Sequence, residues 1–559
     1  MGKYLCNVLL GAAFAITAAA QPTAITGVFN TASYARPGLP NSGIAQGSMI
    51  AIFGRGLGPA SIVQVDRLPL PSALNATSAT IVGAGVYASL GMVYVSDTQV
   101  GAVVPSNAPL GIWELIVNSR QGYARFPIEV VASQFGIFTT NQAGSGPAVV
   151  QNVNSESDRP VNTILKSARP GQAMILWGTG LGPIEGFDFT SPPVGNLNQP
   201  IEVLVAGRRA NILYKGRSGC CAAVDQIVFE VPEGVQGCYV PLVVKNGNNI
   251  SNYTSLSVAA NGGACSDPFG YTADELNTAN NTGKLNVGSV ALVRATVKAT
   301  AMGMSIDTTT ETAVGSFVGY DASQLVASRG NNGTAVTIGA CSLFTVAGES
   351  GAPTDPIRPR VLDAGTAINL SGPNGAKRVP RGADGIYTAQ LSTSTGVGGS
   401  IPGLPGGGAS ASFLTPGSYS TNNGVGGVDV GSFTSSLTIP SNFTWTNENA
   451  ITNVNRASDL NITWSGIQAN GYVFVTGNSF NQAARVGAAF YCLERGSAGR
   501  LIVPSAILLG MPPSAVVQGI QTGVLSVGIT NEPLRFNARG IDVGVFTYSA
   551  STSKRVGFQ

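Results

Sequence analysis

Two segments of the chain repeat each other, and this repeat constrains the fold more than any other feature of the sequence. Residues 47–59 (GSMIAIFGRGLGP) align with residues 171–183 (GQAMILWGTGLGP), and the glycines, one aromatic position and the Leu-Gly-Pro ending coincide. A second pair of blocks, 95–105 and 222–232, follows downstream. Each copy is a unit of about one hundred residues with short apolar runs and frequent turns, which is typical of a β-sandwich. The repeat therefore predicts two β-sandwiches in tandem.

The glycines of the repeat are interpreted as turn residues. Gly54, Gly56 and Gly58 superficially resemble a phosphate-binding loop, but such a loop must lead into a helix whose N-terminus holds the phosphate. In this chain Pro59, and Pro183 in the second copy, follow the glycines, and no helical periodicity begins there. A turn that needs positive φ after a strand explains the glycines. We therefore expect no nucleotide and no other cofactor.

The order of short blocks in this half of the chain carries a family resemblance. NTASY at 30–34 and GIAQGS at 43–48 precede the first glycine block, while ARPG at 168–171 and VAGRRA at 205–210 flank the second. The series resembles the paired immunoglobulin-like module at the C-terminus of many exported acidobacterial proteins of the Solibacter type. In this chain the module is N-terminal, and KGRSGCC replaces the usual segment after Tyr214. The resemblance covers roughly residues 25 to 260 and implies an exported sandwich tandem with no known catalytic residues.

The first twenty residues have the pattern of a secretory signal peptide. Lys3 supplies a positive start, residues 5–18 are mostly apolar, and three alanines end the segment before Gln21. A membrane-spanning helix needs about 20 apolar residues, and this stretch is shorter. No later apolar run in the sequence is long enough either. The sequence therefore predicts a protein that is exported to the cell surface or medium, with no transmembrane segment after cleavage.

The cysteine content indicates disulfides. Of seven cysteines, Cys6 lies in the signal segment, and an even number remains, as expected for an exported chain with disulfides. These are Cys220, Cys221, Cys238, Cys265, Cys341 and Cys492. Adjacent strand residues point to opposite faces, so we expect Cys220 and Cys221 to take different partners. We expect Cys238 and Cys265 to be those partners. The remaining expected pair joins Cys341 to Cys492.

The C-terminal half is rich in Gly, Ser, Thr and Asn, and its strand signals are short. Alternating runs rich in Val, Thr and Tyr predict strands, and only 272–279 has a short helical pattern. The predicted strands are 289–297, 310–318, 385–391, 460–464 and 471–475. A flexible loop is predicted at 398–408, where the region could divide into two subdomains. The 44% hydrophobic content argues against disorder.

These patterns together predict an all-β fold. The expected organisation is a signal peptide at 1–20, immunoglobulin-like domains at 21–132 and 133–262, and a larger Gly/Ser/Thr-rich β-sandwich-like region at 266–559.

The chain has no histidine, 31 Lys and Arg, and 28 Asp and Glu. The missing histidine excludes a Ser-His-Asp or Cys-His nucleophile and any His metal ligand. A Cys-based metal site is disfavoured because no C-x-x-C spacing occurs, and no run of acids forms a calcium loop. We therefore expect no metal. The formal net charge of +3 disfavours nucleic acid as a partner.

Paired carboxylates are the remaining catalytic option, because glycosidases use two acids that flank a cleft. Glu156 lies near Asp158 in the sequence, and Glu185 lies near Asp188. Glu448 lies near Trp445 but has no acidic neighbour. None of these acids belongs to a recognisable motif.

Four tryptophans complete the set of candidate residues. Trp113 and Trp177 occupy expected strand positions in the repeats and are assigned to the core. Trp445 and Trp464 are the candidates for an exposed surface that stacks on sugar rings.

The leading hypothesis is a non-catalytic exported β-protein of the cell envelope, matrix or an adhesion system, with a cell-surface or matrix polysaccharide or protein as its partner. The alternatives are a carbohydrate-binding protein that uses Trp445 or Trp464, and a carboxylate-dependent glycan hydrolase.

Overall fold

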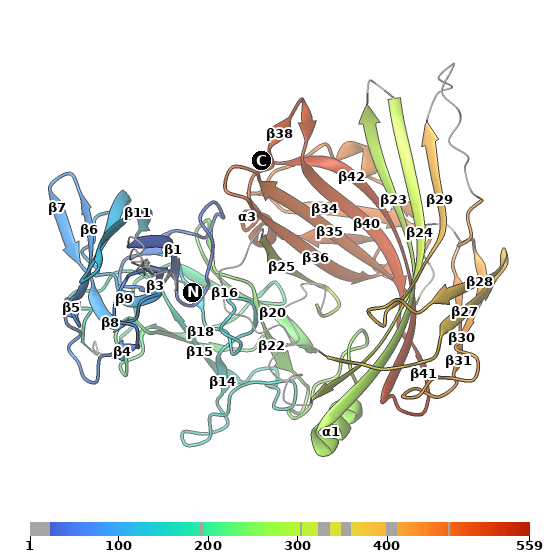
Figure 1. The fold of residues 1–559 in the computed structure, drawn as a ribbon, viewed down its shortest axis with the longest axis horizontal. Coiled ribbons are helices and arrows are strands. Elements are labelled where there is room, and N and C mark those ends of the chain that lie inside the picture. The colour runs from blue at the N-terminus through green and yellow to red at the C-terminus, as the bar shows by residue number, and fades with distance from the viewer. Residues whose placement is uncertain are drawn as a thin grey trace, which may run out of the picture.

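A computed structural model describes residues 23–190, 195–301, 304–321, 336–347, 359–397, 411–441, 443–467 and 470–559. The expected signal peptide at 1–20 and the expected loop at 398–408 lie outside these residues. Strands account for about 54% of the described residues and helices for 4%, which confirms the all-β fold class. Figure 1 shows two sandwiches built from the first half of the chain beside a large sheet built from the second half.

The first sandwich consists of two sheets that enclose one apolar core. The first sheet has the order β1 (Ala24–Asn30), β3 (Met49–Arg55), β9 (Gln99–Val103), β8 (Gly91–Val95) and β4 (Val63–Gln64). The second has the order β2 (Ile44–Ala45), β11 (Gly122–Val131), β10 (Gly111–Ser119), β6 (Thr77–Gly83) and β5 (Ala73–Leu74), and β7 (Val86–Ser89) pairs with β6. Alternate residues face inward, so Ala79 and Ile81 of β6 are fully buried against Ile52 and Leu115.

The second sandwich repeats this plan. One sheet contains β12 (Gly136–Ile137), β15 (Ala173–Thr179), β19 (Asp225–Glu230) and β18 (Ile212–Arg217), with β14 (Val150–Asn152) paired to β15. The other contains β13 (Gly146–Pro147), β22 (Thr254–Val258), β20 (Gly237–Asn246), β16 (Ile201–Val205) and β17 (Arg208–Arg209), with β21 (Asn249–Ile250) paired to β20. In both sandwiches the glycine block ends a strand that pairs with the strand of the downstream block, β3 with β9 and β15 with β19. The two tandem sandwiches are therefore confirmed.

The expectation that positive-φ turns explain the glycine blocks is met in part. Gly54 and Gly178 lie inside β3 and β15, and neither they nor Gly58 has positive φ. Gly56 has φ of 65°, Gly180 has φ of 99° and Gly182 has φ of 136°. This left-handed region is open to glycine at little cost and strained for other residues. Gly180 also packs so closely on the carbonyl of Gln134 that an added Cβ would lie 2.4 Å from its oxygen. These turns therefore require glycine for both conformation and space.

A buried charge cluster joins the two sandwiches. Arg217, only 1% exposed, forms an ion pair with Asp225 through Nη1. Its Nη2 donates to the carbonyl of Gly182 at 2.8 Å and lies 3.7 Å from Asp188. Asp188 in turn accepts from the backbone amide and hydroxyl of Ser106 in the first sandwich, at 2.5 and 2.7 Å. The contact between the sandwiches is therefore specified by hydrogen bonds with fixed partners.

The C-terminal region is built on one large sheet. Its order is β25 (Ala340–Ala347), β36 (Val486–Arg495), β35 (Gly471–Asn481), β40 (Gly523–Asn531), β42 (Val543–Phe558), β23 (Lys284–Ala301), β24 (Met304–Asp321) and β26 (Arg360–Val361). β29 (Tyr387–Val397) pairs with β24, while β33 (Asn453–Val454) and β41 (Leu534–Phe536) pair with β42. The last long strand, β42, lies parallel to the first, β23, so the two ends of the region meet inside one sheet.

Smaller sheets and short helices complete the region. One sheet has the order β28 (Gly375–Pro380), β27 (Ala367–Gly372), β30 (Gly417–Asn422) and β31 (Thr434–Ile439). The others are β32 (Thr444–Trp445), β34 (Leu460–Ser465) and β37 (Arg500–Val503), and the pair β38 (Val516–Val517) and β39 (Ile520–Gln521). Within the described residues, the helices are α1 (Ala273–Thr282), η1 (Glu448–Ala450), η2 (Gly496–Ala498) and α3 (Ser505–Leu509). Ile368 of β27 and Leu437 of β31 share a core with Leu292 and Phe546 of the large sheet, so the region is sandwich-like.

The helix α1 confirms the single helical pattern of the sequence. Thr272 caps its N-terminus and accepts from the amide of Glu275 at 3.2 Å, while the Glu275 carboxylate accepts from the amide of Thr272 at 2.8 Å. This reciprocal arrangement is a capping box. Gly283 ends the helix in the left-handed conformation.

The described residues form three disulfides. The expected pair of Cys341 with Cys492 is confirmed, and these residues face each other across β25 and β36. The pairing expected for the other four is wrong. Cys238 pairs with Cys265, and Cys220 pairs with Cys221.

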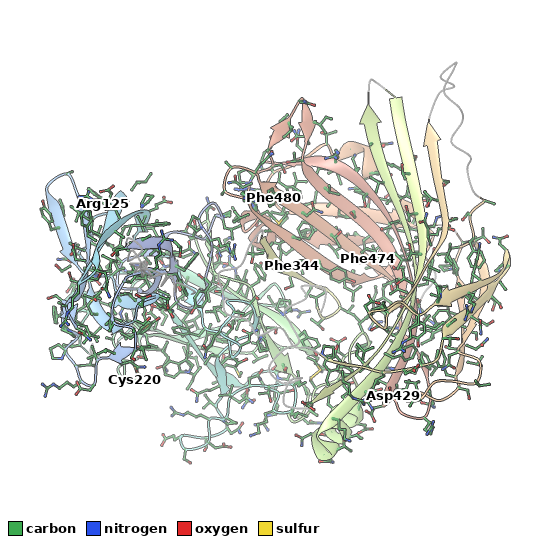
Figure 2. The ribbon with its side chains drawn as sticks, in the orientation of Figure 1. Arg125, Cys220, Phe344, Asp429, Phe474 and Phe480 are labelled. Carbon is green, nitrogen blue, oxygen red and sulfur yellow. A yellow bond between two sulfur atoms is a disulfide. The ribbon has the colours of Figure 1, made fainter. Side chains whose placement is uncertain are left out.

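The physical reason for the error is local structure. Cys220 and Cys221 lie in the turn between β18 and β19, so the alternation of faces along a strand does not apply to them. Both are exposed, and Figure 2 shows Cys220 on the sandwich side of the molecule, away from the large sheet.

Candidate functional site

On the core-facing side of the large sheet, the side chains change from apolar to polar along strands β23 and β42. Every second residue of β23 points to this face, which places Leu292, Arg294 and Thr296 in one row. Leu292 is fully buried, whereas Arg294 and Thr296 are partly exposed. In the register of β23 with β42, Leu292 lies opposite Tyr548 and Thr296 opposite Thr552. The face therefore passes from apolar core to polar surface at Arg294.

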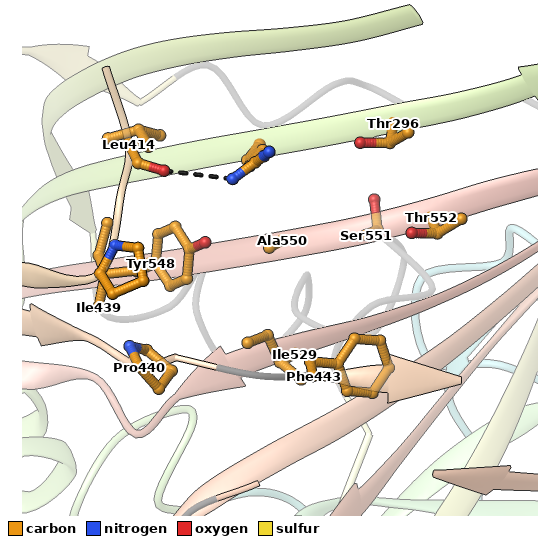
Figure 3. A pocket seen from close by; sticks show the side chains of 12 residues that line it. Thr296, Leu414, Ile439, Pro440, Phe443, Ile529, Tyr548, Ala550, Ser551 and Thr552 are labelled. Atoms are coloured by element: carbon orange, nitrogen blue, oxygen red, sulfur yellow. Dashed lines mark hydrogen bonds between the residues drawn. The ribbon is translucent and has the colours of Figure 1, made fainter. Parts of the chain in front are cut away.

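A cavity of about 290 Å³, here called the Arg294 cavity, opens at this transition (Figure 3). Strands β23 and β42 supply Arg294, Thr296, Tyr548, Ala550, Ser551 and Thr552. The rest of the lining is Leu414, Pro416, Ile439, Pro440, Phe443 and Ile529. One part of the lining therefore carries hydroxyl groups and a guanidinium, and the other part is apolar with one aromatic ring.

Arg294 is held in place at the cavity wall. Its Nη1 donates a hydrogen bond to the backbone carbonyl of Leu414 at 3.3 Å, drawn in Figure 3. Its Nε lies 3.7 Å from Oε1 of Glu311 on the neighbouring strand β24. The side chain of Arg294 nevertheless keeps 37% of its surface exposed. The guanidinium is thus oriented by the protein and remains accessible.

Glu311 fixes the segment that forms the cavity's upper wall. This fully buried carboxylate accepts hydrogen bonds from the hydroxyls of Ser392 and Ser412. It also accepts from the backbone amides of Phe413 at 2.7 Å and Leu414 at 3.1 Å. Burial alone would raise the pKa of Glu311, but these hydrogen bonds outweigh it and hold the pKa below its ordinary value. The ionised carboxylate therefore anchors residues 412–414 and the Arg294 side chain together.

Tyr548 contributes a neutral hydroxyl at the cavity. Burial raises the pKa of Tyr548 to about 12, an effect that Arg294 opposes and Glu311 reinforces. The phenol is therefore protonated at neutral pH and acts as a hydrogen-bonding group without charge.

The two tryptophans expected at an exposed sugar-stacking surface are buried, and that expectation is wrong. Trp445 and Trp464 face each other across β32 and β34, and each is only 5% exposed. Their ring N–H groups donate to Asn447 Oδ1 at 2.9 Å and to the carbonyl of Gly496 at 2.8 Å. Both rings belong to the core of the C-terminal region. Their indole groups are satisfied inside the protein, as is usual for buried tryptophan.

The tryptophans of the repeats are partly buried. Trp113 packs against the core of the first sandwich, in agreement with its assignment. The core assignment of Trp177 is wrong: Trp177 is only half-buried on β15, is not part of the core of the second sandwich, and its ring N–H donates to Gln151 Oε1 at 2.9 Å.

The structure does not bring the candidate acids together in a cavity. Glu156 and Asp158 are exposed in a surface turn of the second sandwich. Glu185 is exposed, whereas Asp188 is buried in the contact between the sandwiches. Glu448 accepts from Lys298 at 2.9 Å and so lies in an ion pair.

Arg294, Phe443 and Tyr548 were not identified from the sequence as site residues. A signal for Arg294 exists, because it is a single cation in the otherwise apolar and hydroxyl-rich run SVALVRATV, on the same period-2 face as Leu292. No local signal identifies Phe443, because its place in the cavity depends on contacts with strands distant in sequence.

No group of three or more His, Cys, Asp or Glu side chains in the described part of the chain is placed to hold a metal ion. Among the helices of the described ranges, none has the length and apolar character needed to cross a membrane.

Comparisons with known proteins give only distant structural similarity. No protein-family model matches the chain, and no curated protein matches it. Among solved structures, SGBP-B from a complex xyloglucan utilization locus in Bacteroides uniformis is 12% identical, with 66% of this chain and 86% of that chain covered and a TM-score of 0.15. Domains 5–6 of the S-layer protein SbsC are 12% identical, with 42% of this chain and 98% of that chain covered and a TM-score of 0.15. The titin Ig tandem A164–A165 is 9% identical, with 39% and 90% covered and a TM-score of 0.11. TM-scores this low do not define a shared fold.

Proposed function

We propose that this protein is a non-catalytic component of the cell envelope or extracellular matrix that binds a polysaccharide in the Arg294 cavity. The two sandwiches act as a spacer that holds the C-terminal region, and the cavity on its large sheet is the binding site.

The lining of the Arg294 cavity is the observation that carries the proposal. A sugar ring presents hydroxyl groups at its edge and C–H groups on its faces, so a site for it needs hydrogen-bonding groups and an apolar surface together. Thr296 and Thr552 supply hydroxyls, and Phe443 and Pro440 supply apolar surface. Small-molecule sites combine a mostly apolar wall with a few polar groups in this way and typically measure about 300–1,000 Å³. The volume of about 290 Å³ suits one ring of a longer chain.

The composition of the lining also favours binding over hydrolysis. Glycoside hydrolysis uses two carboxyl groups that flank the scissile bond. No Asp or Glu belongs to the twelve residues that line the cavity. The proposal therefore contains no catalytic step.

The disulfides support a location outside the cytoplasm. Disulfides form and persist in oxidising compartments, and three join cysteines in the described part of the chain. This agrees with the signal peptide expected at residues 1–20.

The proposal is tested with the full mature chain and a panel of insoluble polysaccharides of bacterial, plant and fungal origin. We expect retention on at least one of them, and a loss of about tenfold or more in affinity in Phe443→Ala, because the variant removes the aromatic surface. Phe480→Ala is the matched control, since Phe480 is 40% exposed and does not line the cavity.

Two results would contradict the proposal. One is that no polysaccharide in the panel retains the protein. The other is that Phe443→Ala binds as tightly as Phe480→Ala, which would remove the cavity as the site.

A further inference from the structure

We infer that the Arg294 cavity selects an anionic sugar, a uronic acid residue whose carboxylate pairs with Arg294. This inference rests on the proposed function and adds to it the chemical class of the ligand.

Arg294 is the one charged residue among the twelve that line the cavity. A guanidinium is always ionised and presents N–H donors in a planar fork that matches a carboxylate. Nη1 of Arg294 is used by the carbonyl of Leu414, and Nε faces Glu311. Within the described residues, Nη2 has no hydrogen-bond acceptor from the protein. A donor therefore remains for a ligand.

Glu311 leaves hydrogen-bond donors of Arg294 unused. The closest approach between the two side chains is 3.7 Å, which is longer than a charge-assisted hydrogen bond. The two carboxylate oxygens already accept four hydrogen bonds from Ser392, Ser412, Phe413 and Leu414. Because those four bonds occupy the carboxylate, it makes no direct hydrogen bond to the guanidinium, and the free N–H donors of Arg294 can bind a second anion. The cost of bringing that anion into the cavity is reduced because the guanidinium is already held in position.

The positions of the other groups fit the rest of a uronate ring. Figure 3 shows Thr296, Ser551 and Thr552 together at the end of the cavity away from Leu414, while Phe443 lies across from the β23 strand that carries Thr296. Thr296 already shares a hydrogen bond with Thr309 at 2.9 Å. A carboxylate at Arg294 would therefore place ring hydroxyls beside Thr552, with the ring face toward Phe443.

The experiment compares oligogalacturonate with the same oligomer in which the carboxylates are methyl-esterified, by isothermal titration of the full mature chain. The two probes differ in charge and keep the same ring. We expect the acid form to bind about tenfold or more tightly than the ester, and this preference to weaken as salt is raised. Arg294→Gln is expected to abolish the preference, while Arg294→Lys keeps the charge and retains part of it.

Arg209→Gln is the matched control, because Arg209 is an exposed arginine on the second sandwich whose side chain is 74% exposed. It is expected to leave both affinities unchanged. Thermal unfolding of each variant is compared with the wild type, and Arg294→Lys provides a folded variant if Arg294→Gln is unstable.

Three outcomes would overturn the inference. Equal binding of acid and ester removes the role of the carboxylate, and stronger binding of a sulfated oligosaccharide of the same length assigns the site to a different anion. The inference is also overturned if neither oligomer binds but the protein still binds a neutral polysaccharide through Phe443. In that case the proposed function remains intact. If no polysaccharide binds at all, the proposed function itself is wrong.

Discussion

Arg217 is the residue on which the contact between the two sandwiches depends. It has an ion pair with Asp225 in its own sandwich and reaches Asp188, which is hydrogen-bonded to Ser106 of the other. All of these charges are almost fully buried. Removing one partner of a buried pair is costly because the other charge stays in a dry environment without compensation.

We therefore predict that Arg217→Gln lowers the free energy of unfolding by about 3–5 kcal/mol. Arg209→Gln removes an exposed ion pair with Glu202 and is predicted to cost less than about 1 kcal/mol. Urea unfolding of the two variants beside the wild type measures both values. Similar losses in the two variants would show that the buried cluster has no special role.

Single residues were the hardest feature to predict from the sequence. The turn glycines at 56, 180 and 182 were predicted correctly, because a strand followed by Gly and Pro is a local signal. Trp445 and Trp464 were predicted wrongly, because their burial depends on sheets that form from distant parts of the chain. The Arg294 cavity was missed for the same reason, since β23, β42 and the segment around Phe443 meet only in the folded protein.

Strands were more predictable than residues. The runs at 289–297 and 310–318 lie within β23 and β24, and 460–464 and 471–475 lie within β34 and β35. Alternation is a local property, so it marks a strand before any partner is known. The parallel pairing of β23 with β42 was not foreseen, because it joins Val287 to Val543 and nothing local encodes a partner so distant.

The disulfide between Cys341 and Cys492 joins two strands, β25 and β36, that are distant in the sequence. Cys341 and Cys492 are 151 residues apart in the sequence, so the bond closes a long loop of the unfolded chain. The bond between Cys220 and Cys221 has a separation of 1 and closes almost no loop. In the chain-entropy account, stabilisation by a disulfide grows with the length of the loop.

We predict that the double variant Cys341→Ala, Cys492→Ala loses about 2–5 kcal/mol of unfolding free energy. The double variant Cys220→Ser, Cys221→Ser is predicted to lose less than about 1 kcal/mol, since its side chains are exposed. Urea unfolding of both proteins under oxidising conditions provides the comparison. Equal losses would mean that local strain or packing, and not loop length, determines what these bonds contribute.

At the scale of the whole molecule, one sheet of the second sandwich, which contains β16 and β20, is covered by apolar contacts on both of its faces. Its inner face forms the core of the sandwich, whereas Leu204, Val243 and Tyr253 on the outer face belong to the core of the C-terminal region. Phe269, between the two parts, meets Tyr472 of β35 edge to face at 4.7 Å between ring centroids. The run of apolar residues in β20, GCYVPLVV, is the sequence counterpart of this double burial, because a strand covered on both faces shows no alternation.

Because this sheet is covered on both faces, its packing against the C-terminal region determines where the Arg294 cavity lies relative to the sandwiches. A flexible linker does not determine it. Leu204 is 8% exposed and points away from the core that contains its neighbours Val203 and Val205. Leu204→Glu would bury a carboxylate without a partner in the contact and leave the inner core of the sandwich unchanged. We predict that this variant keeps its strand content by circular dichroism but undocks, with a larger radius of gyration in small-angle X-ray scattering than the wild type.

Leu213→Glu is the control for this prediction, because Leu213 lies on the same sandwich and is 48% exposed. It should scatter as the wild type does. Amide hydrogen exchange adds a second measurement, since undocking would expose β20 and β25 while the strands β15 and β19 stay protected. If scattering and hydrogen exchange are both unchanged in Leu204→Glu, the prediction is contradicted. Other contacts, such as those of α1 and Phe269, would then hold the sandwich and the large sheet together despite the buried charge.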